Sequence, residues 1–144
     1  MGTLRRNPDL KWRQTPAGVL ELNQKQMSIL GSAARLLKPG GRLVYATCSL
    51  LPQENQVIAE DFLAKHPEFE VVPAAEVLKP LFPKEKLPLG CSADNPWWQL
   101  WPHIHGTDGF FGAIFQKKAA PPAATSEKTV EKEIKVKTKK PAKD

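Results

Sequence analysis

The chain has 144 residues, of which 41% are hydrophobic and 25% are charged, so a single domain with its own core is expected. Its formal net charge of +6 favours a polyanionic partner such as RNA or DNA, although charge that only aids solubility is the alternative. Two cysteines without a CxxC pair argue against a disulfide framework or a zinc site. No signal peptide or membrane-spanning run is recognisable, so we expect a cytoplasmic protein with no metal and no membrane contact.

A basic segment precedes the first predicted helix. Residues 1–14 form a loop with a turn signal at Asn7-Pro8-Asp9. Its cations suit phosphates and its indole suits stacking on a base; the side chains concerned are Arg5, Arg6, Lys11, Trp12 and Arg13. The alternative is a solvated basic segment whose tryptophan packs into the core, and the residues alone leave both interpretations open.

The first long helix is predicted over residues 16–37. Thr15-Pro16 is a typical start, with Thr as the N-cap and Pro in the first turn. Spacings of three, four and seven residues place a set of apolar side chains on one face: Leu20, Met27, Leu30, Ala34 and Leu37. The run Lys38-Pro39-Gly40-Gly41 ends the helix.

A short buried strand is predicted over residues 42–47, where apolar residues run and alternate. Cys48 follows at the point where this strand stops. The carboxyl end of a strand in an α/β sheet is where such folds place ligands and chemistry. A lone cysteine is nevertheless more often a small buried hydrophobe, so position alone does not make Cys48 catalytic.

The next elements are a helix over about residues 53–65, a strand from Phe69 to Val72, a loop-rich stretch over 73–109 and a strand over 109–115. The buried candidates of that helix are Ile58, Phe62 and Leu63. The last strand is almost continuously apolar, which predicts burial on both faces. Helices and strands in this order indicate part of an α/β sandwich.

The loop-rich stretch contains residue types that can carry chemistry. Three tryptophans can stack on bases, but they more often anchor a loop to the core: Trp97, Trp98 and Trp101. Cys91 has no partner in the sequence and is interpreted as incidental. His103 and His105 lie two residues apart without a third ligand, which argues against a metal site.

Residues 119–144 are dominated by Ala, Pro, Thr, Lys and Glu and carry a net charge of +3. Such a composition buries too little apolar surface to offset the entropy of ordering, so we predict a disordered basic tail. A weak electrostatic tether to RNA and a merely solubilising tail are both open.

Three motifs occur in order: GTLRRNPDLKW at residues 2–12, YATCS at 45–49 followed by Glu54-Asn55, and PHIHGTDGFFGA at 102–113. Together they resemble the Sun/Nop family of RNA cytosine-5 methyltransferases, in particular its bacterial Sun (Fmu) branch, the ribosomal RNA small-subunit methyltransferase B type. The resemblance covers residues 2–118 and implies the C-terminal half of the catalytic domain. The implied fold is the C-terminal part of the Rossmann-like, doubly wound sheet of S-adenosylmethionine-dependent methyltransferases.

The resemblance assigns Cys48 as the nucleophile. Carbon 5 of cytosine is a poor nucleophile within an aromatic ring, and a thiolate that adds to carbon 6 makes carbon 5 enamine-like, so that it can attack the methyl sulfonium. Covalent catalysis of this kind splits one difficult step into easier ones. It requires a thiolate, so the surroundings of Cys48 are expected to lower its pKa.

By the same resemblance, the substrate pocket is lined by residues of the first and third motifs: Arg5, Arg6, Lys11, Trp12 and Asp108. Asp108 is expected either to hold a loop or to contact the base. The family's second cysteine, its glycine-rich cofactor loop and its acid for the ribose have no counterpart here, so the residues that bind S-adenosylmethionine are not assigned.

Three interpretations follow, because these parts of the family's site have no counterpart in the sequence. The chain is a fragment of an enzyme that methylates ribosomal RNA, an inactive or merely RNA-binding remnant, or one half of a split enzyme that a complementing N-terminal half chain completes. A half sheet exposes an edge and an apolar face, so the chain alone is expected to be unstable or sticky.

Overall fold

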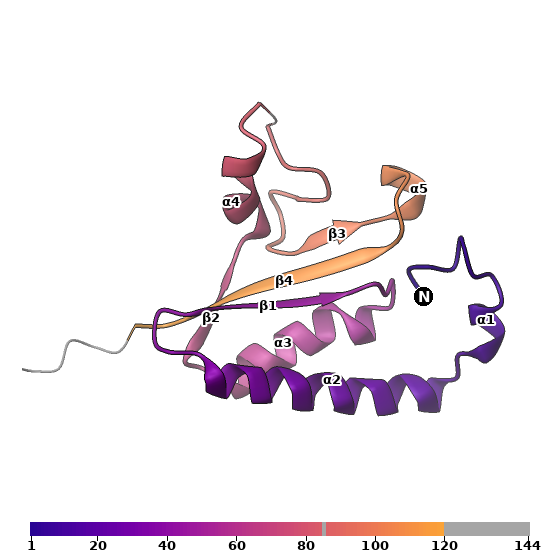
Figure 1. The fold of residues 1–144 in the computed structure, drawn as a ribbon, viewed down its shortest axis with the longest axis horizontal. Helices are drawn as coiled ribbons and strands as arrows, with labels where there is room; N and C mark the ends of the chain where they lie inside the picture. The colour runs from indigo at the N-terminus through magenta and orange to yellow at the C-terminus, as the bar shows by residue number, and fades with distance from the viewer. Residues whose placement is uncertain (85, 120–144) are drawn as a thin grey trace, which may run out of the picture.

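The computed structural model describes residues 1–84 and 86–119. A four-stranded sheet lies at the centre, with the long helix α2 (Pro16–Leu36) and α3 (Gln56–Lys65) packed together on one face (Figure 1). Most of the segment from residue 73 to 97 lies on the other side. The predicted tail falls outside the described residues, apart from residue 119. Among the described residues, no helix is long and apolar enough to cross a membrane.

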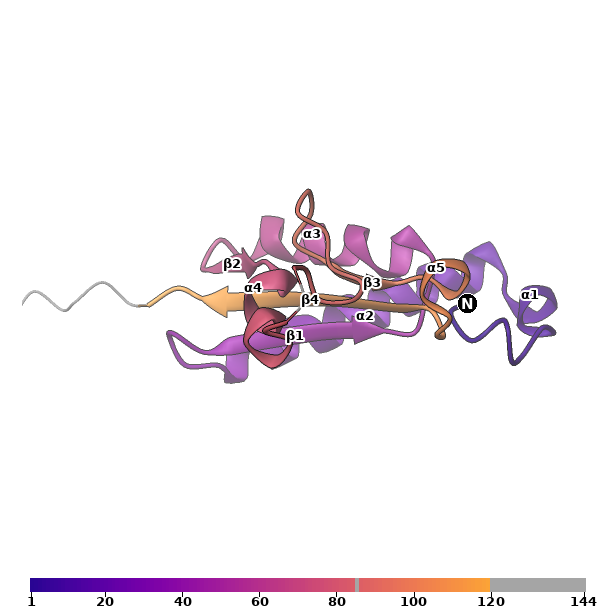
Figure 2. The ribbon, with the colours of Figure 1, turned by 90° about the horizontal axis from the view of Figure 1, so that it is seen from above.

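The central strand of the sheet is β4 (Phe110–Lys117), and every other strand pairs with it in antiparallel fashion. Strand β1 (Arg42–Thr47) lies on one side of β4, while β2 (Phe69–Val72) and β3 (Trp98–Leu100) pair with opposite ends of β4 (Figure 2). Since β1 and β2 both run against β4, they are parallel to each other. Residues 111–115 of β4 are buried, as its apolar sequence predicts.

Helix α2 starts as predicted, because the side-chain oxygen of Thr15 accepts a hydrogen bond of 3.1 Å from the backbone N–H of Gly18. Leu30 and Ala34 of its apolar face are buried. The prediction is wrong for Leu20, which is 64% exposed. The first turns of α2 extend beyond the ends of the strands (Figure 1), so the core does not reach this side chain.

The core lies between the two helices and the sheet. Phe62 of α3 is fully buried, with ring centroids 5.2 Å from Phe69 and 4.9 Å from Phe115. The helix predicted over 53–65 starts later, because Pro52–Glu54 forms a separate 3-10 turn before α3. Leu63 is half-buried against this core rather than fully buried.

The loop-rich stretch contains short elements that its proline content had obscured. These are α4 (Ala74–Leu78), a 3-10 turn (Lys79–Leu81), β3 and α5 (Pro102–His105). Trp97 is buried and packs on Phe111 at 5.8 Å between ring centroids, so the anchoring interpretation is confirmed for this residue. The short helix α1 (Leu10–Arg13) lies in the basic N-terminal segment.

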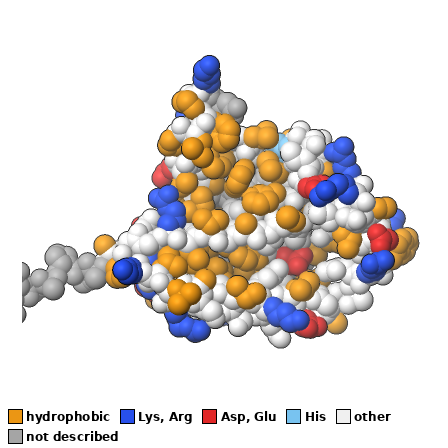
Figure 3. All heavy atoms as spheres, in the orientation of Figure 1, with side chains coloured by type: hydrophobic (Ala, Val, Ile, Leu, Met, Phe, Trp, Pro, Cys, Tyr) orange, Lys and Arg blue, Asp and Glu red, His pale blue; other side chains and the backbone are white. Residues whose placement is uncertain are grey.

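Strand β1 is buried on one face only, in contrast to the buried strand that its sequence predicts. Leu43 and Tyr45 point into the core, whereas Val44 is 60% exposed. On the outer side of β1, where no described strand pairs, a cavity of about 410 Å³ separates the strand from α2. Ile29 of α2 is 70% exposed beside it, and hydrophobic side chains are visible along this side of the molecule (Figure 3).

Candidate active site

Cys48 immediately follows β1 and is exposed to solvent. Its backbone carbonyl accepts a hydrogen bond of 2.7 Å from the N–H of Gly2. A side chain on Gly2 would place a Cβ only 2.2 Å from the same carbonyl oxygen, so only glycine permits this close approach. The N-terminal segment is therefore fastened directly to the backbone of the cysteine.

The loop around Cys48 is held by a network of buried polar side chains. Asn55, which is 2% exposed, donates its side-chain N–H to the carbonyl of Ser49 at 2.9 Å, and its amide oxygen accepts from the hydroxyl of Thr47. The hydroxyl of Ser49 donates to the buried carboxylate of Glu54. Because these bonds lie on both sides of Cys48 in the chain, they fix the position of its backbone.

Tyr45 connects the strand to the same network. Its hydroxyl donates a hydrogen bond of 2.6 Å to the backbone carbonyl of Glu54. Burial, and secondarily the Glu54 carboxylate, raises the pKa of Tyr45 well above its ordinary value. The phenol is therefore held as a neutral donor, and it fixes the turn after Cys48 to the strand before it.

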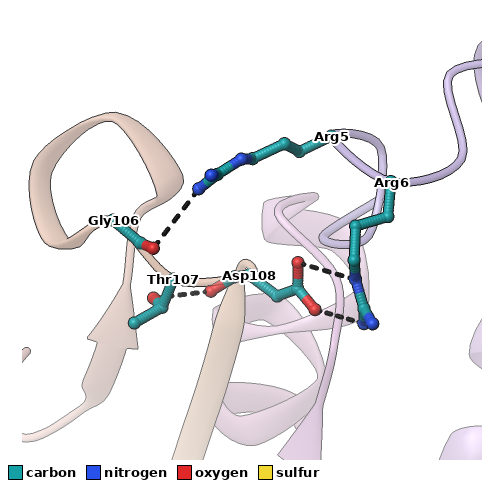
Figure 4. Close-up of polar contacts among 5 residues, drawn as sticks. All are labelled: Arg5, Arg6, Gly106, Thr107 and Asp108. Carbon is teal, nitrogen blue, oxygen red and sulfur yellow. Dashed lines mark hydrogen bonds and ion pairs between the residues drawn. The ribbon is translucent and has the colours of Figure 1, made fainter.

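Residues of the first and third sequence motifs contact each other (Figure 4). Arg6 forms an ion pair with Asp108 through two nitrogens, and Arg5 donates to the carbonyl of Gly106 at 3.3 Å. The N–H of Gly109 donates to the carbonyl of Gly2 at 2.9 Å. The ion pair joins Asp108, in the loop before β4, to the N-terminal segment. Arg6 remains 67% exposed while paired.

Lys11 and Trp12 project from α1. The indole of Trp12 is 80% exposed, so the alternative in which it packs into the core is wrong. The ammonium of Lys11 lies 4.8 Å from the centre of that ring, a cation–π distance. The pair offers one cation and one aromatic face on the surface.

A cavity of about 460 Å³ lies between the N-terminal segment, the start of α2 and the chain just after Cys48. Lys11 and Gln53 contribute polar groups to it, and Leu20 and Leu51 contribute apolar walls. Asn23 also lines it, and its amide oxygen is buried without a hydrogen-bond partner in the described part of the chain. The sequence analysis missed Asn23, although a polar residue on the apolar face of a helix, three residues after Leu20, is a recognisable signal.

Cys91 is not part of this site. It is half-buried in a small cavity beside His105, and burial raises the pKa of its thiol, which keeps it protonated. Within residues 1–84 and 86–119, no group of three or more His, Cys, Asp or Glu side chains could hold a metal ion.

Comparisons with known proteins identify the family. The family described as 16S rRNA methyltransferase RsmB/F matches residues 1–116. The chain belongs to this family. A probable ribosomal RNA small subunit methyltransferase B from Synechocystis sp. is 41% identical over 117 residues, which are 81% of this chain and 25% of that protein. The chain spans about a quarter of the length of the curated relatives it matches.

Solved structures show the same fold. The crystal structure of PH0851 is similar with a TM-score of 0.67 and 41% identity, over 81% of this chain and 24% of that one. NSun6 from Pyrococcus horikoshii, solved with SFG, matches with a TM-score of 0.56 over 74% of this chain and 25% of that chain; at 23% identity it shows the fold alone. The predicted fold class, part of a methyltransferase α/β sheet, is confirmed.

Proposed function

We propose that this RsmB/F chain supplies the nucleophile for methylation of carbon 5 of a cytosine in RNA, with ribosomal RNA as the expected substrate. One observation carries the proposal: the thiol of Cys48 is exposed at the end of β1, while the loop around it is held by Thr47, Ser49 and Asn55. An exposed thiol in a fixed position can meet a base, whereas a structural cysteine would be buried.

The step assigned to this chain is addition and release. The sulfur of Cys48, as thiolate, forms a bond to carbon 6 of the cytosine, and the π electrons of the 5,6 double bond move toward carbon 5, which becomes nucleophilic. After carbon 5 has been substituted, it loses its proton to a base, the sulfur–carbon bond breaks, and its electrons return to the sulfur while the ring regains the double bond. Reaching carbon 6 requires an unstacked cytosine, which single-stranded or loop RNA provides cheaply.

S-adenosylmethionine, the cofactor expected for a methyltransferase of this family, would supply the methyl group. The described residues do not fit that group. The two cavities beside β1 and Cys48 are lined by no acidic side chain that could bind a ribose. We therefore assign no cofactor residue here, and a complementing N-terminal half chain stays a prediction.

The substrate residues are proposed with distinct tasks. Lys11 and Trp12 are free to meet RNA, through a phosphate and a base respectively. Arg5, Arg6 and Asp108 join the N-terminal segment to the loop before β4, and the exposed guanidinium of Arg6 can also face a phosphate. Binding by these cations should weaken as salt rises.

The test is a covalent adduct with RNA that contains 5-azacytidine, a cytosine analogue that traps the attacking thiolate, measured by intact mass with and without S-adenosylmethionine. Cys48→Ala should abolish the adduct. Cys91→Ala is the matched control, since it removes the other cysteine, and should leave the adduct unchanged. An adduct that survives Cys48→Ala would contradict the assignment of the nucleophile.

The exposed Lys11–Trp12 pair also favours a second candidate, an RNA-binding chain without catalysis. In that case RNA binding would persist in Cys48→Ala and weaken with salt, and no adduct would form with the unchanged chain. The adduct experiment therefore separates the two candidates.

A further inference from the structure

We propose that the cavity lined by Lys11, Leu20, Asn23, Leu51 and Gln53 binds the base of a nucleotide next to the target cytosine, and that the amide of Asn23 accepts a hydrogen bond from an N–H on that base. The inference rests on the proposed function, because it takes the RNA substrate as given. The cavity would give the RNA a second binding site on the chain, through which the chain recognises a nucleotide next to the target cytosine.

The position of the cavity connects it to Cys48. Leu51 and Gln53 follow the cysteine by three and five residues, on the loop that the buried network holds. Met1 also lines the cavity, and its neighbour Gly2 is hydrogen-bonded to the backbone of Cys48. The cavity is therefore lined by the two segments that flank the cysteine, which is why we assign to it a nucleotide next to the target.

The size and walls of the cavity suit a base. Its volume of about 460 Å³ falls within the range typical of small-molecule sites, roughly 300–1,000 Å³. Leu20, Leu51 and Val19 form apolar walls on which a flat ring can lie. Leu20 is 64% exposed although it continues the apolar face of α2, so this wall lacks a cover among the described residues.

Asn23 provides the most specific indication of a ligand. Its amide oxygen is shielded from solvent and has no hydrogen-bond partner among residues 1–84 and 86–119, which is rare for a buried acceptor. A half-turn of the carboxamide exchanges its oxygen and nitrogen, so either can be presented to the cavity it lines. The edge of a base can supply the missing N–H donor, and it also carries acceptors for the N–H groups of the Asn amide.

Lys11 supplies the charge that the backbone of such a nucleotide requires. It lines the cavity and also lies against the exposed ring of Trp12. A phosphate at Lys11 would leave the base inside the cavity and allow the following base to stack on Trp12. No acidic side chain lines the cavity, so nothing there repels a phosphate.

The experiment measures the affinity of the full chain for a fluorescent seven-nucleotide RNA with a central cytidine, without cofactor. Two further RNAs lack the base on the 5′ or the 3′ side of that cytidine. The unchanged chain should bind one of them about five- to tenfold more weakly than the intact RNA, as expected for the loss of a hydrogen bond and a stacked ring. Asn23→Leu removes the hydrogen bond but keeps the apolar walls, so it should bind the intact RNA about threefold more weakly. It should also distinguish the intact RNA from that RNA less well than the unchanged chain does.

Gln56→Leu is the matched control. Gln56 has an equally buried, unpartnered amide oxygen but does not line the cavity. Both substitutions remove a buried acceptor without a partner, so both should raise the melting temperature, and only Asn23→Leu should change RNA affinity. Folding and binding are thereby measured separately.

The outcomes separate this proposal from the function it rests on. If Asn23→Leu binds the intact RNA like the unchanged chain, or if both base-lacking RNAs bind normally, the base pocket is wrong while the Cys48 adduct stands. If the pocket effect is present but no adduct forms at Cys48, the pocket stands and the chemistry is wrong. If the unchanged chain binds none of the RNAs, both are wrong.

Discussion

Tyr45 shows how one side chain of β1 affects the loop that carries the nucleophile. Its ring packs edge-on against Phe111 at 6.3 Å between centroids, and its hydroxyl reaches the backbone carbonyl of Glu54. The residue thereby joins the apolar core to the buried polar network. The preceding residue, Val44, faces solvent instead. Adjacent side chains of β1 therefore lie on opposite faces of the sheet, one in the core and one exposed.

We expect Tyr45→Phe to lower the free energy of unfolding at pH 7 by about 1–3 kcal/mol, because the carbonyl of Glu54 loses its buried donor. The folded pKa of Tyr45 lies above its ordinary value of 10.0, so the unfolded chain loses the phenol proton first as pH rises. The stabilisation is therefore complete below about pH 10 and is lost above it. Urea unfolding at pH 7 to 11 should show the gap between the two proteins narrowing; a constant gap would contradict the buried neutral phenol.

Arg6 and Asp108 belong to different motifs that lie about a hundred residues apart in the chain. Both were expected in the substrate pocket, and the structure pairs them with each other. An ion pair with one partner 67% exposed is worth little stability by itself. Its effect is positional, since it fixes the N-terminal segment against the loop before β4.

The element that matters most for chemistry is the loop between β1 and α3. Side chains of the loop bind its own backbone, as where the hydroxyl oxygen of Ser49 accepts from the N–H of Leu51 at 3.1 Å. From outside the loop, Gln26 of α2 donates to the carboxylate of Glu54 at 3.4 Å. The helix α3 begins only after Asn55, because the side chain of that residue is bonded to Thr47 and Ser49 rather than capping the helix.

We expect Asn55→Ala to lower the free energy of unfolding by about 2–3 kcal/mol, since it leaves the carbonyl of Ser49 and the hydroxyl of Thr47 buried without their partner. It should also slow adduct formation at Cys48 in conditions where the protein remains folded. Chemical unfolding and the rate of adduct formation check the two effects. Gln24→Ala, an amide removed from the exposed side of α2, is the control and should change neither.

At the scale of the whole molecule, the outer edge of β1 is the open side. Val44 and Ile29 are 60% and 70% exposed beside an edge of β1 with which no described strand pairs. A strand with free backbone groups and apolar neighbours is a template for pairing with another chain. The stickiness expected from the sequence stays a prediction, and it applies to this edge.

Val44→Lys is expected to reduce self-association of the chain, because a charge beside the edge disfavours strand pairing. Sedimentation velocity across a range of protein concentrations measures this directly. Leu81→Lys is the matched control, since Leu81 is 70% exposed but lies in the 3-10 turn Lys79–Leu81, which is not part of the sheet. Equal effects of the two substitutions would show that general hydrophobicity, and not the edge of β1, governs association.

Local features of the chain determined the elements around Cys48. The bounds of β1 and β2, the start of α2 at Thr15-Pro16 and the place of the cysteine after the strand agree with the structure. These features depend on residues a few positions apart, whose steric and hydrogen-bonding preferences are already present in the sequence. The three motifs were sufficient to indicate the family.

Contacts between distant residues were decided only by the tertiary structure. Strands β1, β2 and β3 all pair with β4. Arg6 forms an ion pair with Asp108, and the N–H of Gly2 donates to the carbonyl of Cys48. Periodicity also could not show that Leu20 stays exposed or that the amide of Asn23 lacks a partner. Both depend on where the rest of the chain passes over the first turns of α2, because burial is a property of the packed neighbours and not of the residue or its spacing.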